Sequence, residues 1–131
     1  MTVTLSSKVG VLTSPLQGGL DLNNKPVYQT EYDNGTSGAA ITIDYSANGN
    51  AQSVELTNNC AFTFTDPPGA CHVTLLFRQD AVGGHAVTWP ATVLWQNATE
   101  PVWTTNISDK NIAFFYFDGG RYNGSGLVDV S

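Results

Sequence analysis

Residues 60–79 read CAFTFTDPPGACHVTLLFRQ, and this stretch decides the fold. Apolar side chains alternate with threonine and other residues on both sides of one interruption. Alternation at a period of two puts every second side chain on the same face of a strand, so each half predicts a strand with one buried face. The interruption, Asp66-Pro67-Pro68-Gly69, cannot continue a strand or a helix because proline has no N–H donor. The pattern indicates a scaffold or binding surface rather than an enzyme.

Short stretches of the same kind follow one another along most of the chain, and no window shows convincing helical periodicity. A chain of 131 residues is long enough for one domain with its own core. Eight to ten short strands predict an all-β domain, an antiparallel β-sandwich of jelly-roll type, over residues 27–131. The expected strands are 27–32, 40–46, 52–57, 60–65, 71–79, 85–89, 93–95, 111–118 and 126–130, with a turn at 33–35 and the longest loop at 96–111.

Residues 1–26 predict an extended N-terminal arm rather than part of the core. Glycine and proline interrupt this segment repeatedly, so its apolar residues cannot form a long strand. Those side chains need a cover, and either this domain or a partner could provide it. The candidate partner-binding residues of the arm are Val3, Leu5, Val9, Val11, Leu12, Leu16, Leu20 and Leu22.

The charge of the chain excludes some partners. The formal net charge is −6, with five lysine and arginine residues and no basic stripe to neutralise phosphates. Direct binding to nucleic acid is therefore disfavoured. No apolar run approaches the roughly 20 residues that span a bilayer, and the N-terminus lacks the features of a signal peptide. We expect no membrane partner and no export by the usual route.

The two cysteines, Cys60 and Cys71, are predicted to be buried free thiols. Each shares the parity of neighbouring apolar residues, and a free cysteine on such a face acts as a small hydrophobe. A symmetric hairpin around residues 66–69 would place Cys71 opposite Phe64, which also argues against a disulfide. The spacing of the two cysteines matches no zinc signature.

The search for catalytic chemistry gives no constellation. His72 and His85 are the only histidines, and nothing in the sequence brings either to a nucleophile and an orienting acid. Glu31, Glu55 and Glu100 could form a glycosidase pair, but any acidic protein offers such pairs. No glycine-rich loop precedes a helix in the manner of a phosphate-binding motif. We expect no enzyme activity, no cofactor and no metal.

Three aromatic residues allow two interpretations. Trp95 and Trp103 flank a polar loop, and Tyr122 follows a glycine turn. They could form a platform on which sugars stack, or they could close the core or a subunit interface, where Trp and Tyr are also enriched. The second interpretation is favoured, and Trp89 is expected in the core.

An ordered series of turn and core motifs resembles a known class of domain. The series is Thr65–Ala70, Leu75–Asp80, Gly83-Gly84, Val87–Ala91, Trp95 and Phe117–Gly120. It resembles β-sandwich domains of tailed-phage virion structural proteins, including tail fibres and small head proteins. The resemblance covers most of the chain loosely, and it implies a homotrimer on a virus particle.

Two functions follow from this resemblance. The first is a capsid decoration (cement) protein, made in the host cytoplasm, whose arm binds the major capsid protein on the outer surface of the head. The alternative is a tail-fibre or host-surface adhesin that binds glycans through Trp95, Trp103 and Tyr122. The apolar arm and the absence of a long shaft favour the first function, and exposed tryptophans beside a groove would favour the second.

Overall fold

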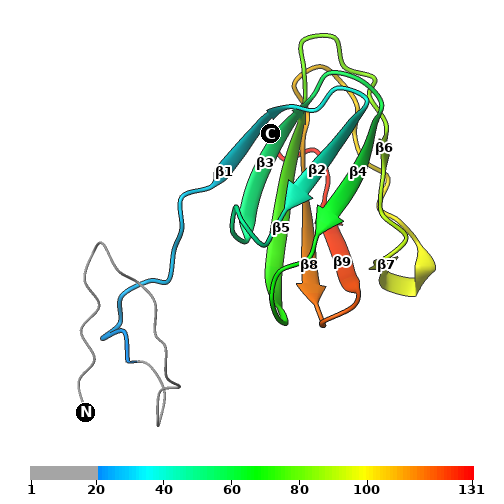
Figure 1. The fold of residues 1–131 in the computed structure, drawn as a ribbon. Coiled ribbons are helices and arrows are strands. Elements are labelled where there is room, and N and C mark those ends of the chain that lie inside the picture. The colour runs from blue at the N-terminus through cyan, green and yellow to red at the C-terminus, as the bar shows by residue number, and fades with distance from the viewer. Residues whose placement is uncertain (1–20) are drawn as a thin grey trace.

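The structure, a computed structural model, describes residues 21–131 and consists of two facing β-sheets (Figure 1). The strands are β1 (Tyr32–Thr36), β2 (Ala40–Asp44), β3 (Ala51–Leu56), β4 (Cys60–Thr65), β5 (Cys71–Gln79), β6 (Val87–Thr88), β7 (Val93–Trp95), β8 (Lys110–Phe117) and β9 (Tyr122–Leu127). One sheet has six strands in the order β1-β3-β5-β8-β9-β7, and the other has three in the order β2-β4-β6. The all-β prediction is confirmed.

The one helical element in residues 21–131 is a 3-10 turn, η1 (Gln96–Ala98), inside the expected long loop. It is far too short to cross a membrane, and no other helix occurs in the described part of the chain.

The two facing sheets agree with the predicted sandwich, but the strand pairing is mixed rather than antiparallel throughout. The first six strands alternate between the two sheets, so β1, β3 and β5 pair in parallel in one sheet while β2, β4 and β6 pair in parallel in the other. Each connection between these strands leads from one sheet to the other instead of turning back within a sheet. The intervening strand in the opposite sheet therefore serves as the crossover connection that two parallel strands need. β7 also pairs in parallel with β9, and only β5–β8 and β8–β9 are antiparallel.

The corner at residues 66–69 shows why the pairing differs. It carries the chain from β4 in the three-stranded sheet to β5 in the six-stranded sheet, so the two strands do not form the expected hairpin. Phe64 pairs with Ile43 of β2, and Cys71 pairs with Phe117 of β8. The alternation of side chains is the same in a hairpin and in a sheet-to-sheet corner, so the sequence pattern could not separate the two.

Three local expectations also need correction. Residues 27–31 form no strand, and every residue from 21 to 31 is exposed. The expected turn at residues 33–35 lies within β1, where Gly35 has a φ of 71° and the register with β3 shifts, as in a bulge. The last strand begins at Tyr122 rather than at residue 126.

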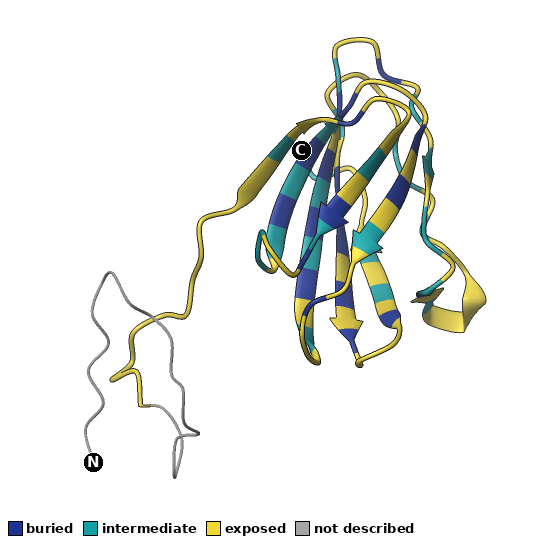
Figure 2. Cartoon of the chain, viewed as in Figure 1, coloured by how far each residue is buried: buried dark blue, intermediate teal, exposed yellow. Residues whose placement is uncertain are grey.

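The core lies between the two sheets, and buried residues alternate with exposed ones along the strands (Figure 2). It includes four of the apolar residues that the period-two pattern selected on β4 and β5: Phe62, Val73, Leu75 and Phe77. Phe64, the fifth, is half-buried and packs against the core. Trp89, expected in the core, is half-buried and packs against it.

Buried amide side chains satisfy backbone groups where the strands end. Gln52 Nε2 donates to the carbonyls of Asp44 and Gly49, at 2.8 and 2.9 Å. Asn111 Nδ2 donates to the Thr104 carbonyl at 2.9 Å, and its Oδ1 accepts from Thr104. Within residues 21–131, every buried side-chain nitrogen and oxygen has a hydrogen-bond partner. These amides therefore hold loops that have little apolar surface of their own.

Both cysteines are free, as predicted. Cys60 is buried in the core, and Cys71 is half-buried and packs against it. Burial raises the pKa of the Cys60 thiol above its ordinary value, although hydrogen bonds from Ser37 and the Ile41 backbone oppose this shift. A protonated thiol is a poor nucleophile, so Cys60 is a structural residue.

Adjacent leucines on β5 test the register of the core. Leu75 is fully buried, whereas Leu76 is half-buried on the other face of the strand. We expect Leu75→Ala to lower the free energy of unfolding by about 2–5 kcal/mol, because it leaves a cavity. Leu76→Ala, the matched control, should cost about 1 kcal/mol. Urea denaturation measures the free energy of unfolding of both variants. Equal losses of stability would contradict the assignment of Leu75 to the inner face of β5 and Leu76 to the outer face.

Two buried tyrosines predict a loss of stability at alkaline pH. Burial raises the pKa of Tyr45, and burial together with the neighbouring Asp66 raises that of Tyr122. The folded protein therefore keeps phenolic protons that the unfolded chain releases near pH 10. Stability is fully present below about pH 10 and falls above it, by up to about 1.4 kcal/mol per pH unit for each tyrosine.

Urea unfolding between pH 8 and pH 11 measures this slope. The double variant Tyr45→Phe/Tyr122→Phe is less stable at pH 8 but should lose stability less steeply above pH 10. An unchanged slope in the double variant would show that other groups cause the alkaline transition.

Candidate functional site

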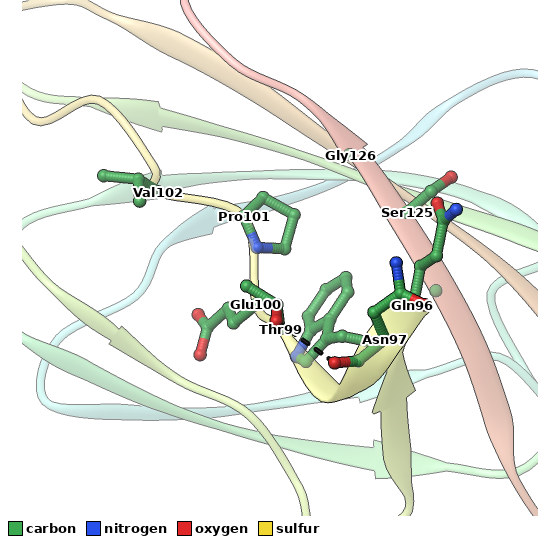
Figure 3. A pocket seen from close by; sticks show the side chains of 10 residues that line it. Gln96, Asn97, Thr99, Glu100, Pro101, Val102, Ser125 and Gly126 are labelled. Carbon is green, nitrogen blue, oxygen red and sulfur yellow. Dashed lines mark hydrogen bonds between the residues drawn. The ribbon is translucent and has the colours of Figure 1, made fainter.

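A groove lies between the segment of residues 95–102 and strand β9, and it has a volume of about 620 Å³ (Figure 3). One wall is formed by η1 and the residues that follow it, and the other by the middle of β9. Gln96 and Asn97 lie on one side in Figure 3, and Pro101 and Val102 lie on the other. The lining residues are Trp95, Gln96, Asn97, Thr99, Glu100, Pro101, Val102, Gly124, Ser125 and Gly126.

The three tryptophans of the chain meet beside this groove. The ring centroids of Trp95 and Trp103 are 5.7 Å apart, and Trp89 lies 5.3 Å from Trp95 and 5.7 Å from Trp103. Trp89 and Trp95 also contact Phe115 of the core, at 5.7 and 5.6 Å. The indoles therefore form a rigid aromatic cluster that connects the core to the wall of the groove.

Glu100 holds two of these indoles in place. Its Oε1 accepts a hydrogen bond from Trp89 Nε1 and another from Trp103 Nε1, each at 2.8 Å. A carboxylate that accepts N–H bonds makes charge-assisted hydrogen bonds, which are stronger than neutral ones. Glu100 thus fixes the loop that carries it to the aromatic cluster, and it serves as a structural support for the groove.

Glycine on β9 allows the indoles to lie directly on the strand. A Cβ at Gly124 would come within 2.8 Å of both Trp95 and Phe115. A Cβ at Gly126 would overlap the Trp103 indole and come within 3.2 Å of Pro101 Cγ. The alternation of glycine with Asn123 and Ser125 therefore gives β9 one face for tryptophan and one polar face.

The turn at η1 has an uncommon backbone conformation. Asn97 and Ala98 both have a φ of 55°, in the left-handed region that costs a non-glycine residue about 1 kcal/mol or more. The Thr99 backbone N–H donates to the Gln96 carbonyl at 3.1 Å, and its hydroxyl donates to the Asn97 carbonyl at 3.2 Å. This tight turn places the amide and hydroxyl side chains of Gln96, Asn97 and Thr99 around the groove.

The three aromatic residues that the sequence proposed as a sugar platform do not form one exposed surface. Trp95 lines the groove, and Trp103 is half-buried against Gly126 behind it. Tyr122 is fully buried, and its hydroxyl donates to Asp66 Oδ1 at 2.7 Å. Tyr122 therefore presents no ring face to a ligand, and its role in a sugar platform is a wrong prediction. Its ring packs in the core because β9 begins at Tyr122, four residues earlier than expected.

Of the eight arm residues proposed to bind a partner, seven lie outside the described residues. These are Val3, Leu5, Val9, Val11, Leu12, Leu16 and Leu20. The eighth, Leu22, is 37% exposed. Binding of a partner by the arm stays a prediction.

Two other pairs of titratable residues support a loop and a strand surface. His85 Nε2 lies 3.0 Å from Asp80 Oδ1, which also accepts from the backbone N–H groups of Val82 and Gly83. Those two N–H groups are the main reason that the pKa of Asp80 is lowered. Glu55 forms an ion pair with Arg78 at 3.1 Å. Among residues 21–131, no three His, Cys, Asp or Glu side chains group as metal ligands.

Sequence reasoning missed two features of the groove. Glu100 was considered only as half of a catalytic pair, although a carboxylate between Trp95 and Trp103 in one loop could have suggested a hydrogen bond to indole. The sequence analysis also assigns no role to the glycines of β9. Their spacing of two residues within a strand was the available signal, because a glycine inside a strand often marks a close approach of another group.

Comparison with known proteins gives a family match. The family model described as "Putative phage tail fibre C-terminal domain" matches residues 34–119, which is more than half of the chain. The matched segment runs from β1 through β8 and includes the loop that carries Glu100. No curated protein and no solved structure matches the chain.

A substitution at Gly126 tests the contact between β9 and the tryptophan cluster. We expect Gly126→Ala to lower the free energy of unfolding by about 1–3 kcal/mol, because the added methyl group displaces the Trp103 indole. Tryptophan fluorescence should change with it. Gly69→Ala is the matched control, since nothing lies within 4 Å of its added Cβ. A Gly126→Ala variant with unchanged stability and fluorescence would contradict the packing.

Proposed function

Because this chain belongs to the phage tail fibre C-terminal domain family, we propose that its groove binds a glycan on the surface of the host bacterium. Membership of this family indicates a bacteriophage structural protein. The family description fits a tail-fibre function better than capsid decoration. The observation that supports glycan binding is the groove itself, in which Trp95 lies among amide and hydroxyl side chains.

A sugar ring has an apolar face and a rim of hydroxyl groups, and the groove offers a counterpart for each. The indole of Trp95 and the ring of Pro101 supply apolar surface. Gln96, Asn97 and Ser125 supply donors and acceptors that suit hydroxyl groups. Because the tryptophan cluster and Glu100 hold these groups in place before binding, little conformational entropy is lost when the ligand binds.

The proposed assembly is a homotrimer. Three grooves on one particle component would let weak individual contacts add up to strong attachment, as expected for multivalent binding. Sedimentation of the full chain at micromolar concentration tests this part of the proposal, and a monomer alone would argue against it.

Capsid decoration predicts a different location. In that function the arm, residues 2–22, would contact the major capsid protein, and the chain would be found over the shell. Immunolabelling of purified phage particles separates the two functions. We expect label at the tail, and label distributed over the head would replace the glycan proposal with the decoration function.

A double variant of the groove tests the proposed function directly. A printed array of bacterial surface polysaccharides should identify a ligand for the full chain. The double variant Gln96→Ala/Ser125→Ala should then bind that ligand about 10-fold more weakly, because two hydrogen bonds of about 0.5–1.5 kcal/mol each are lost. Both residues are exposed, so the fold should persist.

Ser46→Ala is the control, because Ser46 is an exposed serine on the turn after β2, away from the groove. Equal affinity of the double variant and the control would contradict the assignment of this groove. A chain that binds no polysaccharide on the array would contradict the glycan proposal as a whole.

A further inference from the structure

The groove is the first part of a longer hollowed surface. A second hollow of about 310 Å³ shares Trp95, Gln96, Gly124 and Ser125 with the groove and continues to Leu94 and Asn123. A third hollow, of about 250 Å³, shares Asn123 and Ser125 with the second. We call these three adjoining hollows the track. It begins beside the tryptophan cluster at η1, passes over the edge strands β7 and β9, and ends on the face of β8 and β5 that points away from the core.

Half-exposed aromatic side chains stand beside polar ones at the far end of the track. Phe114 is 39% exposed and Tyr116 is 45% exposed. The sheet register pairs Phe114 with Ser125, and it pairs Tyr116 with Asn123. Each exposed ring is therefore next to a hydrogen-bonding side chain on the neighbouring strand. This is the same combination of apolar surface and polar group that Trp95 and Gln96 form at the other end.

The polar residue in the middle of the track is fixed in position. Asn123 Nδ2 donates to the Tyr116 carbonyl at 3.2 Å and to Asp118 Oδ2 at 3.0 Å. The ring of Tyr116 also lies 5.3 Å from that of His72 on β5. These contacts hold the far end of the track on rigid strands, so its geometry does not depend on a loop.

The charges along the track favour a neutral ligand. Glu100 is the one carboxylate in the lining, His72 is its one histidine, and no lysine or arginine lines any of the three hollows. An acidic sugar would lose water without gaining a cation, and the net charge of −6 would repel it. The hollows are open to solvent, so a chain could enter and leave at both ends.

We infer that the track binds an extended, neutral polysaccharide over several sugar units, with Phe114 and Tyr116 as the distal contact. This inference rests on the proposed function, since it names the class of glycan and the length that the site recognises. The shared lining of the three hollows is the observation that distinguishes one long site from a groove for a single terminal sugar.

The test uses the polysaccharide array and fragments of its strongest neutral ligand, cut by partial acid hydrolysis and separated into lengths of one to eight units. We expect the array to favour neutral over acidic polysaccharides, and we expect the affinity of the full chain, measured by calorimetry, to rise with fragment length. Tyr116→Ser should weaken binding of the longest fragments by about 10-fold, as for loss of an aromatic contact of about 1.4 kcal/mol. The same variant should bind two-unit fragments with unchanged affinity.

Tyr32→Ser is the matched control, because Tyr32 is 43% exposed on β1, at the opposite edge of the sheet from β7. It should bind fragments of every length as the unchanged protein does. Affinity that does not depend on fragment length, or a preference for acidic polysaccharides, would contradict the inference of an extended neutral site. The glycan proposal would still stand in either case. If Tyr116→Ser instead dissociates an oligomer in sedimentation, this face is a subunit contact and the inference fails. An array without any ligand would overturn the proposed function itself.

Discussion

The aromatic layer between the two sheets is the constraint on which the rest of the structure depends. Phe64 of the three-stranded sheet contacts Phe115 and Tyr122 of the six-stranded sheet, with ring centroids 5.6 and 4.9 Å apart. Such edge-to-face contacts are directional, so they fix how the sheets face each other as well as excluding water. Phe77 and Phe115 then contact the tryptophans, which extend the layer out of the core and into the wall of the groove.

The candidate site is rigid because it is an extension of this layer. Trp95 contacts Phe115 on one side and lines the groove on the other. Glu100 secures the loop by accepting hydrogen bonds from two indoles, and the glycines of β9 let the strand lie close beneath them. A ligand would therefore meet groups whose positions the core has already determined, which is the arrangement that binding sites on stable scaffolds require. The loop is irregular in conformation but firmly held.

The alternation of the first six strands between the two sheets explains where this site lies. Parallel pairing runs through β1, β3 and β5, and the chain leaves that pattern only when β8 and β9 add to the large sheet in antiparallel fashion. The segment between β6 and β8 has to cover the end of the aromatic layer, and it contains both Trp95 and Trp103. The long loop thus packs over the end of the core, and the groove forms where this loop meets β9.

The sequence by itself determined which side chains face inward, since alternation is a local property of each strand: Phe62, Val73, Leu75 and Phe77 are buried as their parity predicts. It also determined the all-β class, the free cysteines and the presence of tryptophan beside a polar loop. Only the tertiary structure decided which strands pair and in which direction, because a corner and a hairpin have the same local pattern. It also decided the burial of Tyr122, whose hydroxyl bonds to Asp66, 56 residues away. The groove depends in the same way on contacts between β9 and a distant loop, and no local pattern encodes such contacts.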